Sequence, residues 1–240
     1  MKTLFSRRKP KDKEKYTLDR RAYNIFNNLI DFIITAGIVI ALGVGAFSIF
    51  VDVKKNNDLK IGYTSYSMDD LGAVAWLKVD KTEINFPIMQ GSTNTEYLNK
   101  NPLGQMDLAG SIFLDSTNNA KFTDPYSVVY GHHLDNGLMF GTLDPYLKKS
   151  YLKTHTTGTI EVKGGPTYKL RLFSCFHVLS TNEIIFNASA QTTTKKVEKY
   201  IEKNDPDHLT YNESLPIVAL STCVNATSEN RVVVFGTLQN

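Results

Sequence analysis

Near its C-terminal end the chain reads Pro216-Ile217-Val218-Ala219-Leu220-Ser221-Thr222-Cys223 and then, after a short polar turn, Arg231-Val232-Val233-Val234-Phe235-Gly236. Both runs are apolar and of strand length, so we predict two strands joined by a loop. A thiol ends the first run and a guanidinium opens the second. In such a hairpin the side chains of Cys223 and Arg231 can lie side by side at one edge of a sheet. A thiolate beside a cation is the arrangement that makes a cysteine a usable nucleophile.

The region before this hairpin is also dominated by short strands. Further strand candidates are separated by turn-like clusters, and they cover 74–79, 84–89, 111–115, 127–131, 159–162 and 168–178. Helical patterns are few: a short helix is expected over 138–146, and an amphipathic one over 192–203. About eight short strands indicate a mainly β fold, a barrel or a sandwich, with a helical excursion before the penultimate strand.

The N-terminal part has a different character. Residues 32–51 are uncharged and strongly apolar, and a helix of that length spans the roughly 30 Å core of a bilayer. The preceding residues are rich in Lys and Arg, so the positive-inside rule keeps the N-terminus in the cytoplasm. The alternative is a cleaved signal peptide, but the apolar run exceeds the usual core of about 7–15 residues. The basic character is confined mainly to this tail, and we infer no nucleic-acid binding from it.

The predicted organisation therefore has four parts. Residues 1–31 form a basic cytoplasmic tail, 32–51 a transmembrane anchor, 52–71 a polar membrane-proximal linker, and 72–240 an extracellular domain.

A nucleophilic cysteine needs a proton acceptor, and five histidines are available. His132 and His133 directly follow the predicted strand 127–131, where a strand runs into a loop, and loops at strand ends commonly carry catalytic groups. Both could equally be exposed loop residues. His155 and His208 lie in polar segments, and we expect them at the surface.

Cys175 and His177 are a rival pair. They lie two residues apart and therefore on one face of the predicted strand 168–178. That spacing fits a dyad, but more often it reflects a small buried thiol beside a polar residue. A further possibility is a disulfide between Cys175 and Cys223, the two cysteines of the chain.

Taken together, these residues resemble the sortases, the membrane-anchored cysteine transpeptidases of Gram-positive bacteria. That family carries a strand-ending T-L-x-T-C motif, which Ala219 to Cys223 matches at all but the first position. It also carries an arginine near the start of the next strand, as at Arg231, and a histidine in a Gly-His context, as at His132. The resemblance covers about residues 72–238 and implies a closed β-barrel.

Within the family the chain resembles class B. The features that match are Ser221 in the cysteine motif, the segment from Tyr130 to Phe140, the helical insertion 181–216, and the segment 90–98 after the second strand. Residues 224–230 lack the longer acidic form of some relatives, so no role is carried over to Glu229. Asp69-Asp70-Leu71 does not resemble the lid of pilus-dedicated class C enzymes.

The resemblance implies a mechanism. Cys223 attacks the carbonyl of a Thr in a C-terminal sorting signal, His132 transfers protons, and Arg231 stabilises the developing negative charge. Ser221 and Asn94 are implied in substrate binding. The thioacyl group then passes to an amine, either of a peptidoglycan cross-bridge or of a pilin lysine. We expect no cofactor and no metal site.

Two other hypotheses remain open on the sequence. The chain could be an extracellular cysteine peptidase that hydrolyses cell-wall peptides, with water as the acceptor. It could also be a non-enzymatic, membrane-tethered β-domain stapled by a Cys175–Cys223 disulfide.

Overall fold

The computed structural model describes residues 11–60, 63–134, 137–223 and 229–240; for 11–19, 52, 54–60 and Cys223 it describes the backbone alone. The chain divides into two compact units, Met1–Asn56 and Asn57–Asn240.

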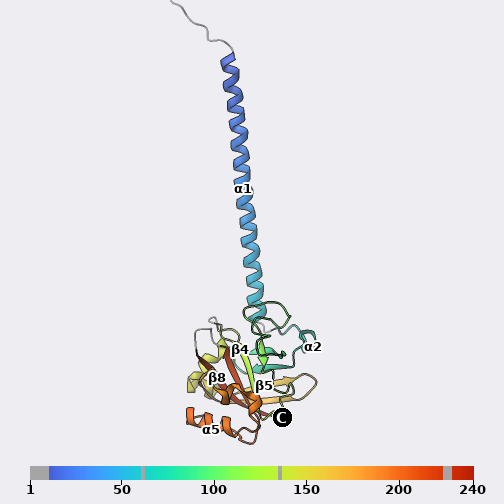
Figure 1. The fold of residues 1–240 in the computed structure, drawn as a ribbon, viewed down its shortest axis with the longest axis vertical. Helices are drawn as coiled ribbons and strands as arrows, with labels where there is room; N and C mark the ends of the chain where they lie inside the picture. Colours follow the sequence, from blue (N-terminus) through green and yellow to red (C-terminus); the bar gives the residue numbers. More distant parts are fainter. Residues whose placement is uncertain (1–10, 61–62, 135–136, 224–228) are drawn as a thin grey trace, which may run out of the picture. The chain divides into compact units, whose positions relative to one another are not determined.

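The first unit is built on one helix. Helix α1, Lys11–Lys60, is continuous over 50 residues (Figure 1). Its segment Arg20–Val51 contains an 18-residue window with a mean hydropathy of 2.4, none of which is buried, so by length and composition the segment can cross a membrane. The predicted span 32–51 lies inside this segment. The helix continues through 52–60, where we expected a linker, because that stretch contains no Pro or Gly to end it.

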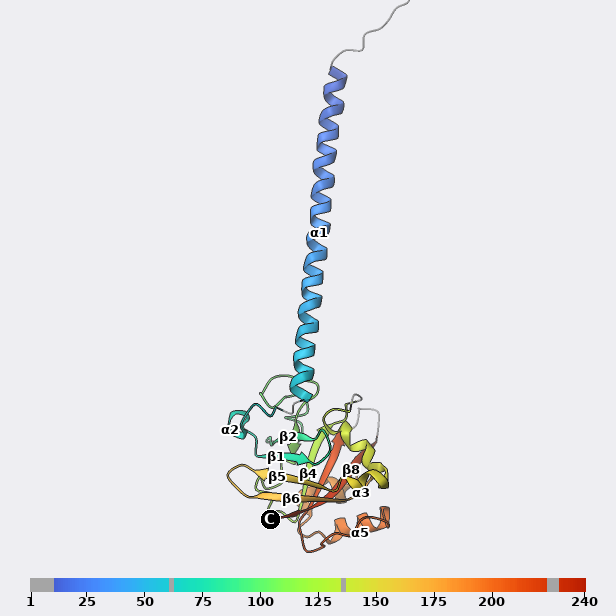
Figure 2. The ribbon, with the colours of Figure 1, turned by 180° about the vertical axis from the view of Figure 1, so that it is seen from behind.

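The second unit is a closed β-barrel, which confirms the predicted mainly β fold (Figure 2). Its strands are β1 Ala75–Val79, β2 Asn85–Met89, β3 Ile112–Leu114, β4 Tyr126–His132, β5 Thr157–Val162, β6 Thr167–Leu179, β7 Ile217–Cys223 and β8 Asn230–Gln239. Around the barrel their order is β1-β2-β3-β4-β7-β8-β6-β5. Most of the predicted strands agree with these bounds to within one or two residues.

Strand composition follows position in the barrel. In β1 the inward residues Ala75, Leu77 and Val79 are buried and alternate with more exposed neighbours. Strand β7 is instead buried continuously from Ile217 to Thr222, as expected of a strand covered on both faces. The hydroxyl of Thr222 accepts a hydrogen bond from the N–H of Val232 at 3.0 Å, so this buried polar group is satisfied.

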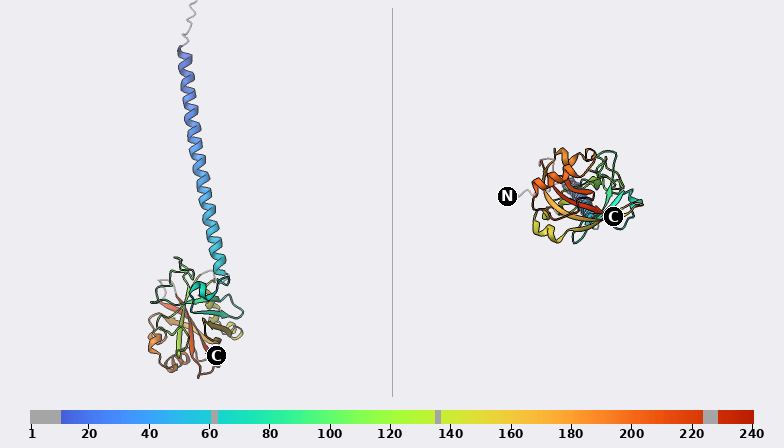
Figure 3. Two further views of the ribbon diagram at one scale, coloured as in Figure 1. Left: turned by 90° about the vertical axis from the view of Figure 1, so that its right-hand side faces the viewer. Right: turned by 90° about the horizontal axis from the view of Figure 1, so that it is seen from below.

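Short helices connect the strands. They are α2 Met68–Leu71, the 3₁₀ helix η1 Phe140–Leu147, α3 Lys149–Thr154, α4 Glu183–Phe186, the 3₁₀ helix η2 Ala188–Ala190 and α5 Lys195–Asn204. The helical insertion between β6 and β7 is present as predicted. Its helix α5 buries Val197 and Ile201, and the ring centroids of Tyr200 and of Phe176 on β6 are 6.1 Å apart. The ribbon of the insertion, in orange, lies against the barrel (Figure 3).

Two pairings decide where functional side chains gather. Strands β4 and β7 are parallel and in register from Tyr126 with Ile217 to His132 with Cys223, so both strands end at the same edge. Strands β7 and β8 are antiparallel, so β8 begins at that edge. The C-terminal ends of β4 and β7 and the N-terminal end of β8 therefore meet there.

Candidate active site

The sequence-predicted residues His132, Cys223 and Arg231 meet at this edge of the barrel. The backbones of His132 and Cys223 are direct partners across the β4–β7 pair. The β7–β8 register runs to Ser221 with Val233, and the next residues outward are Thr222 and Val232, which hydrogen-bond. One position further on each strand are Cys223 and Arg231. The ends of three neighbouring strands thus bring the backbones of Cys223, His132 and Arg231 together.

The ring of His132 is held by backbone groups of another segment. Its Nε2 lies 2.5 Å from the carbonyl oxygen of Leu98. A carbonyl oxygen can only accept, so Nε2 donates and the neutral ring carries its proton there. Nδ1 is then the ring nitrogen that can exchange a proton with a substrate. The backbone of Gly110, at a φ of 59°, packs against the same ring and against the Leu98 carbonyl.

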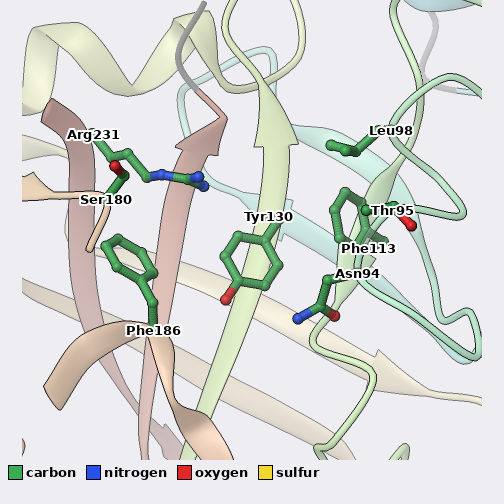
Figure 4. A pocket seen from close by; sticks show the side chains of 8 residues that line it. All are labelled: Asn94, Thr95, Leu98, Phe113, Tyr130, Ser180, Phe186 and Arg231. Atoms are coloured by element: carbon green, nitrogen blue, oxygen red, sulfur yellow. The ribbon is translucent and has the colours of Figure 1, made fainter. Parts of the chain in front are cut away.

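Arg231 is half-buried beside the insertion. The carbon at the centre of its guanidinium lies 5.1 Å from the ring centroid of Phe186, at the end of α4, a cation–π contact. Figure 4 shows the guanidinium pointing toward Tyr130. The planar group is therefore oriented by the ring beside it and stays charged at any ordinary pH.

A pocket with a volume of about 260 Å³ lies between these elements (Figure 4). It is lined by Asn94, Thr95, Leu98, Phe113, Tyr130, Ser180, Phe186 and Arg231. Aromatic and aliphatic side chains dominate, with a few polar groups and one cation. Such a lining suits an extended peptide with apolar side chains and a carbonyl to be bound.

The two predicted substrate-binding residues lie differently. Asn94 lines the pocket, and both ends of its amide are fixed: Nδ2 donates to Asp115 at 2.8 Å and Oδ1 accepts from the N–H of Ser116 at 2.7 Å. Ser221 is fully buried, and its hydroxyl donates to the carbonyl of Thr222 at 3.2 Å. In the register Ser221 lies opposite the pocket residue Tyr130 and on the same face of β7 as Cys223; it is buried there, and its hydroxyl is turned to the backbone.

Cys175 and His177 do not form a second site. Burial raises the pKa of the Cys175 thiol, and the carboxylates of Asp205 and Asp144 raise it further, so this thiol stays protonated at neutral pH. His177 is exposed. Cys175 is also a free cysteine, which removes the alternative of a Cys175–Cys223 disulfide.

The remaining histidines are engaged elsewhere. His133 lies next to the site, but its Nε2 is 2.8 Å from Asp144. His155 stacks on Tyr151 with 3.7 Å between ring centroids, and His208 packs against Phe173 and Tyr211.

Several residues of the site escaped sequence reasoning: Leu98, which orients the histidine through its carbonyl, Phe186, which underlies the arginine, and Asp115, which holds Asn94. A backbone carbonyl leaves no mark in the sequence. The sequence gives only a weak indication for the other two. Phe186 is the last residue of the apolar run Ile184-Ile185-Phe186, and Asp115 directly follows the apolar run Ile112-Phe113-Leu114.

Comparison with known proteins agrees with this architecture. The Sortase domain family model matches residues 77–239. Sortase B of Staphylococcus aureus is 31% identical over 171 residues, 70% of this chain and 63% of the relative. Sortase B of Listeria monocytogenes is 33% identical over 155 residues, 62% of each chain. The alignments thus span somewhat less than two thirds of the curated relatives.

Solved structures show the same likeness. A class B sortase of Streptococcus pyogenes involved in pilus biogenesis has a TM-score of 0.64 and 36% identity, covering 73% of this chain and 99% of that one. Staphylococcus aureus Sortase B has a TM-score of 0.60 and 28% identity, covering 71% and 82%.

A closed barrel that gathers a cysteine, a histidine and an arginine at one edge is the architecture of a sortase domain, and this chain belongs to the sortase family. Its relatives by sequence and by structure are class B sortases.

Proposed function

We propose that this chain is a class B-like sortase, a cysteine transpeptidase that transfers proteins bearing a C-terminal sorting signal to an amine. The observation that carries the proposal is the β4–β7 register, which pairs His132 with Cys223 next to the start of β8. The likeness to class B sortases supports the same reading.

The first half-reaction forms a thioester. Nδ1 of His132 takes the proton of the Cys223 thiol, and the resulting thiolate attacks the Thr carbonyl of the sorting signal, whose carbon becomes tetrahedral. The guanidinium of Arg231 stabilises the oxyanion by charge-assisted hydrogen bonds. As the C–N bond breaks, His132 donates a proton through Nδ1 to the leaving amine, and the segment after the Thr departs.

The second half-reaction restores the enzyme. An incoming amine loses a proton to Nδ1 of His132 and attacks the thioester, and the C–S bond breaks as the new amide forms. Cys223 is released as a thiolate. The pocket between Asn94 and Phe186 would seat the residues of the signal, with its apolar walls around their side chains.

The cellular setting follows from the anchor. We propose that α1 crosses the membrane once, with the basic N-terminal residues in the cytoplasm and the barrel outside. The substrates would then be surface proteins or pilins. The acceptor would be a peptidoglycan cross-bridge amine, for wall anchoring, or a pilin lysine, as the Streptococcus pyogenes relative's role in pilus biogenesis suggests.

A transfer assay tests the proposal. The full chain in detergent micelles is incubated with candidate sorting-signal peptides and either an oligoglycine or a lysine-bearing peptide, and products are read by mass. We expect amide-linked products from the wild type and none from Cys223→Ala. Cys175→Ala is the matched control and should retain transfer, because its thiol stays protonated.

Two outcomes would contradict the proposal. Transfer by Cys223→Ala would remove the nucleophile from the mechanism. Free acid as the sole product in excess amine would instead favour a cysteine peptidase.

A further inference from the structure

A buried carboxylate lies directly behind the pocket. Asp115 follows β3 and is only 2% exposed. Its backbone N–H donates to the carbonyl of Val128 at 2.8 Å and so extends the contact with β4. A carboxylate in such a place is costly unless both oxygens are well satisfied.

Four donors from neighbouring segments satisfy it. Oδ2 accepts from Nδ2 of Asn94 at 2.8 Å and from the hydroxyl of Tyr130 at 3.1 Å. Oδ1 accepts from the N–H of Thr117 at 2.9 Å and from its hydroxyl at 2.7 Å. Oδ2 therefore binds the pocket residues Asn94 and Tyr130, and Oδ1 binds Thr117 in the turn after β3. All four partners are neutral donors, and one donor on each oxygen is an N–H group, which cannot accept; the position therefore requires a group that only accepts.

This arrangement fixes the polarity of the pocket wall. Because Oδ1 of Asn94 already accepts from Ser116, the amide cannot flip without losing both hydrogen bonds. Nδ2 carries two hydrogens, and Asp115 takes one of them. The other is the hydrogen that Asn94 can offer to a ligand. The same carboxylate holds the Tyr130 ring, another wall of the pocket, through its hydroxyl.

We infer that Asp115 is a positioning residue for the donor substrate: it locks the Asn94 amide as a hydrogen-bond donor and fixes the Tyr130 ring, so that the pocket is organised for a carbonyl of the sorting signal before the signal arrives. This inference rests on the proposed function. Preorganisation of this kind lowers the entropy cost of ordering the pocket when the peptide binds. Its loss should therefore raise KM for the peptide more than it lowers kcat.

Asp115→Asn is the sharpest variant, because it keeps the shape and replaces one acceptor oxygen by an NH₂ group. Whichever way the new amide turns, its NH₂ meets donors, either those of Thr117 or those of Asn94 and Tyr130. We expect KM for the sorting peptide to rise about tenfold or more, as for the loss of a charge-assisted hydrogen bond, with kcat changed less than threefold. KM for the amine should not change, since the pocket binds the other substrate.

Thr117→Val is the matched control. It also removes a hydrogen bond to Asp115, but on the oxygen that faces away from the pocket. We expect it to lower the melting temperature while KM for the sorting peptide stays within twofold of the wild type. Asp115→Glu keeps an acceptor-only group and should restore part of the affinity that Asp115→Asn loses.

A measurement on the wild type keeps the inference testable if Asp115→Asn does not fold. In NMR spectra of the full chain in micelles, the Asn94 side-chain amide should show one hydrogen protected from exchange and the other exchanging freely. Equal, fast exchange of both would overturn the inference, as would an unchanged KM in a folded Asp115→Asn variant. If instead the wild type transfers no peptide at all, it is the proposed function that fails.

Discussion

The imidazole of His132 shows how single backbone atoms prepare a catalytic group. The carbonyl of Leu98 accepts a hydrogen bond from its Nε2, and the backbone of Gly110 packs against its ring. A Cβ on residue 110 would lie 2.9 Å from Cδ2 of His132 and would collide with the Leu98 carbonyl oxygen. The positive φ of 59° adds strain for any residue with a side chain. Glycine is therefore required here by space as well as by conformation.

Gly110→Ala should consequently impair catalysis. We expect transfer to fall by about 10²-fold, because a small displacement of a reacting group has effects of that order, and the melting temperature to fall as well. Peptide turnover and thermal unfolding of the purified variant measure both.

Gly104→Ala is the control for backbone strain. Gly104 also has a positive φ, 79°, but an added Cβ there meets nothing within 4 Å. It should cost about 1 kcal/mol of stability and leave turnover unchanged. If both variants lose turnover equally, strain in this loop rather than contact with His132 is responsible.

At the residue scale the sequence predicted the groups with distinctive chemistry. Cys223, His132 and Arg231 could be predicted as candidates because a thiol, an imidazole and a guanidinium stand at predicted strand ends in an order that resembles the sortases. The positioning groups were not found, because their role depends on distance: Asp115 acts on Asn94 across a gap of 21 residues. Ser221 was proposed for substrate binding because it belongs to the cysteine motif, but its side chain is fully buried.

At the scale of elements, the short helix α4 links the barrel to the site. Its N-cap Asn182 accepts a hydrogen bond from the N–H of Ile185, and the buried hydroxyl of Tyr126, on β4, donates to the Ile185 carbonyl at 3.1 Å. The next residue is Phe186, which lies under the guanidinium of Arg231. The helix is too short to be stable alone, so these bonds fix where that ring lies.

Tyr126→Phe tests this connection. The change leaves the carbonyl of Ile185 without its partner, and we expect a loss of about 1–3 kcal/mol in the free energy of unfolding. Transfer should also fall, because α4 is held less firmly and the Phe186 ring then no longer fixes the guanidinium of Arg231. Denaturant unfolding and turnover measure the two effects.

Tyr168→Phe serves as the comparison. Its hydroxyl donates to the carbonyl of Lys121 at 3.3 Å in an exposed setting, where water can replace it. The expected change in stability is below about 0.5 kcal/mol. Similar losses of transfer in the two variants would contradict a special role for Tyr126.

Element types were predictable where periodicity was strong, as in the β-rich runs and in α5. The element predicted over 138–146 is instead a 3₁₀ helix, Phe140–Leu147, with Pro145 inside it, because proline cannot join an α-helical ladder in that position. The parallel pairing of β4 with β7 could not be predicted from spacing, since the strands are distant in sequence.

At the scale of the whole molecule, the two units have opposite solvent preferences. Segment Arg20–Val51 carries many large apolar side chains that are exposed. The barrel unit, from Asn57 onward, buries a large apolar core of its own. The first unit thus suits a lipid environment by length and composition, whereas the second covers its apolar residues with its own chain.

This division predicts how the parts behave when separated. The full chain should float with phospholipid vesicles in a density gradient, and a fragment of residues 57–240 should stay in the aqueous fraction with a cooperative thermal transition. A fragment that aggregates or unfolds without cooperativity would show that the barrel depends on the first unit.

The place of β8 has a consequence for biosynthesis. This strand lies between β7 and β6, and it carries Arg231. His132 is on β4, which is synthesised about 100 residues earlier. Pairings between distant segments form late, because the chain entropy of closing long loops must be overcome first. Under the proposed mechanism the site is therefore incomplete until β8 has paired with β7 and β6. The same late pairing that closes the barrel would also switch on the nucleophile.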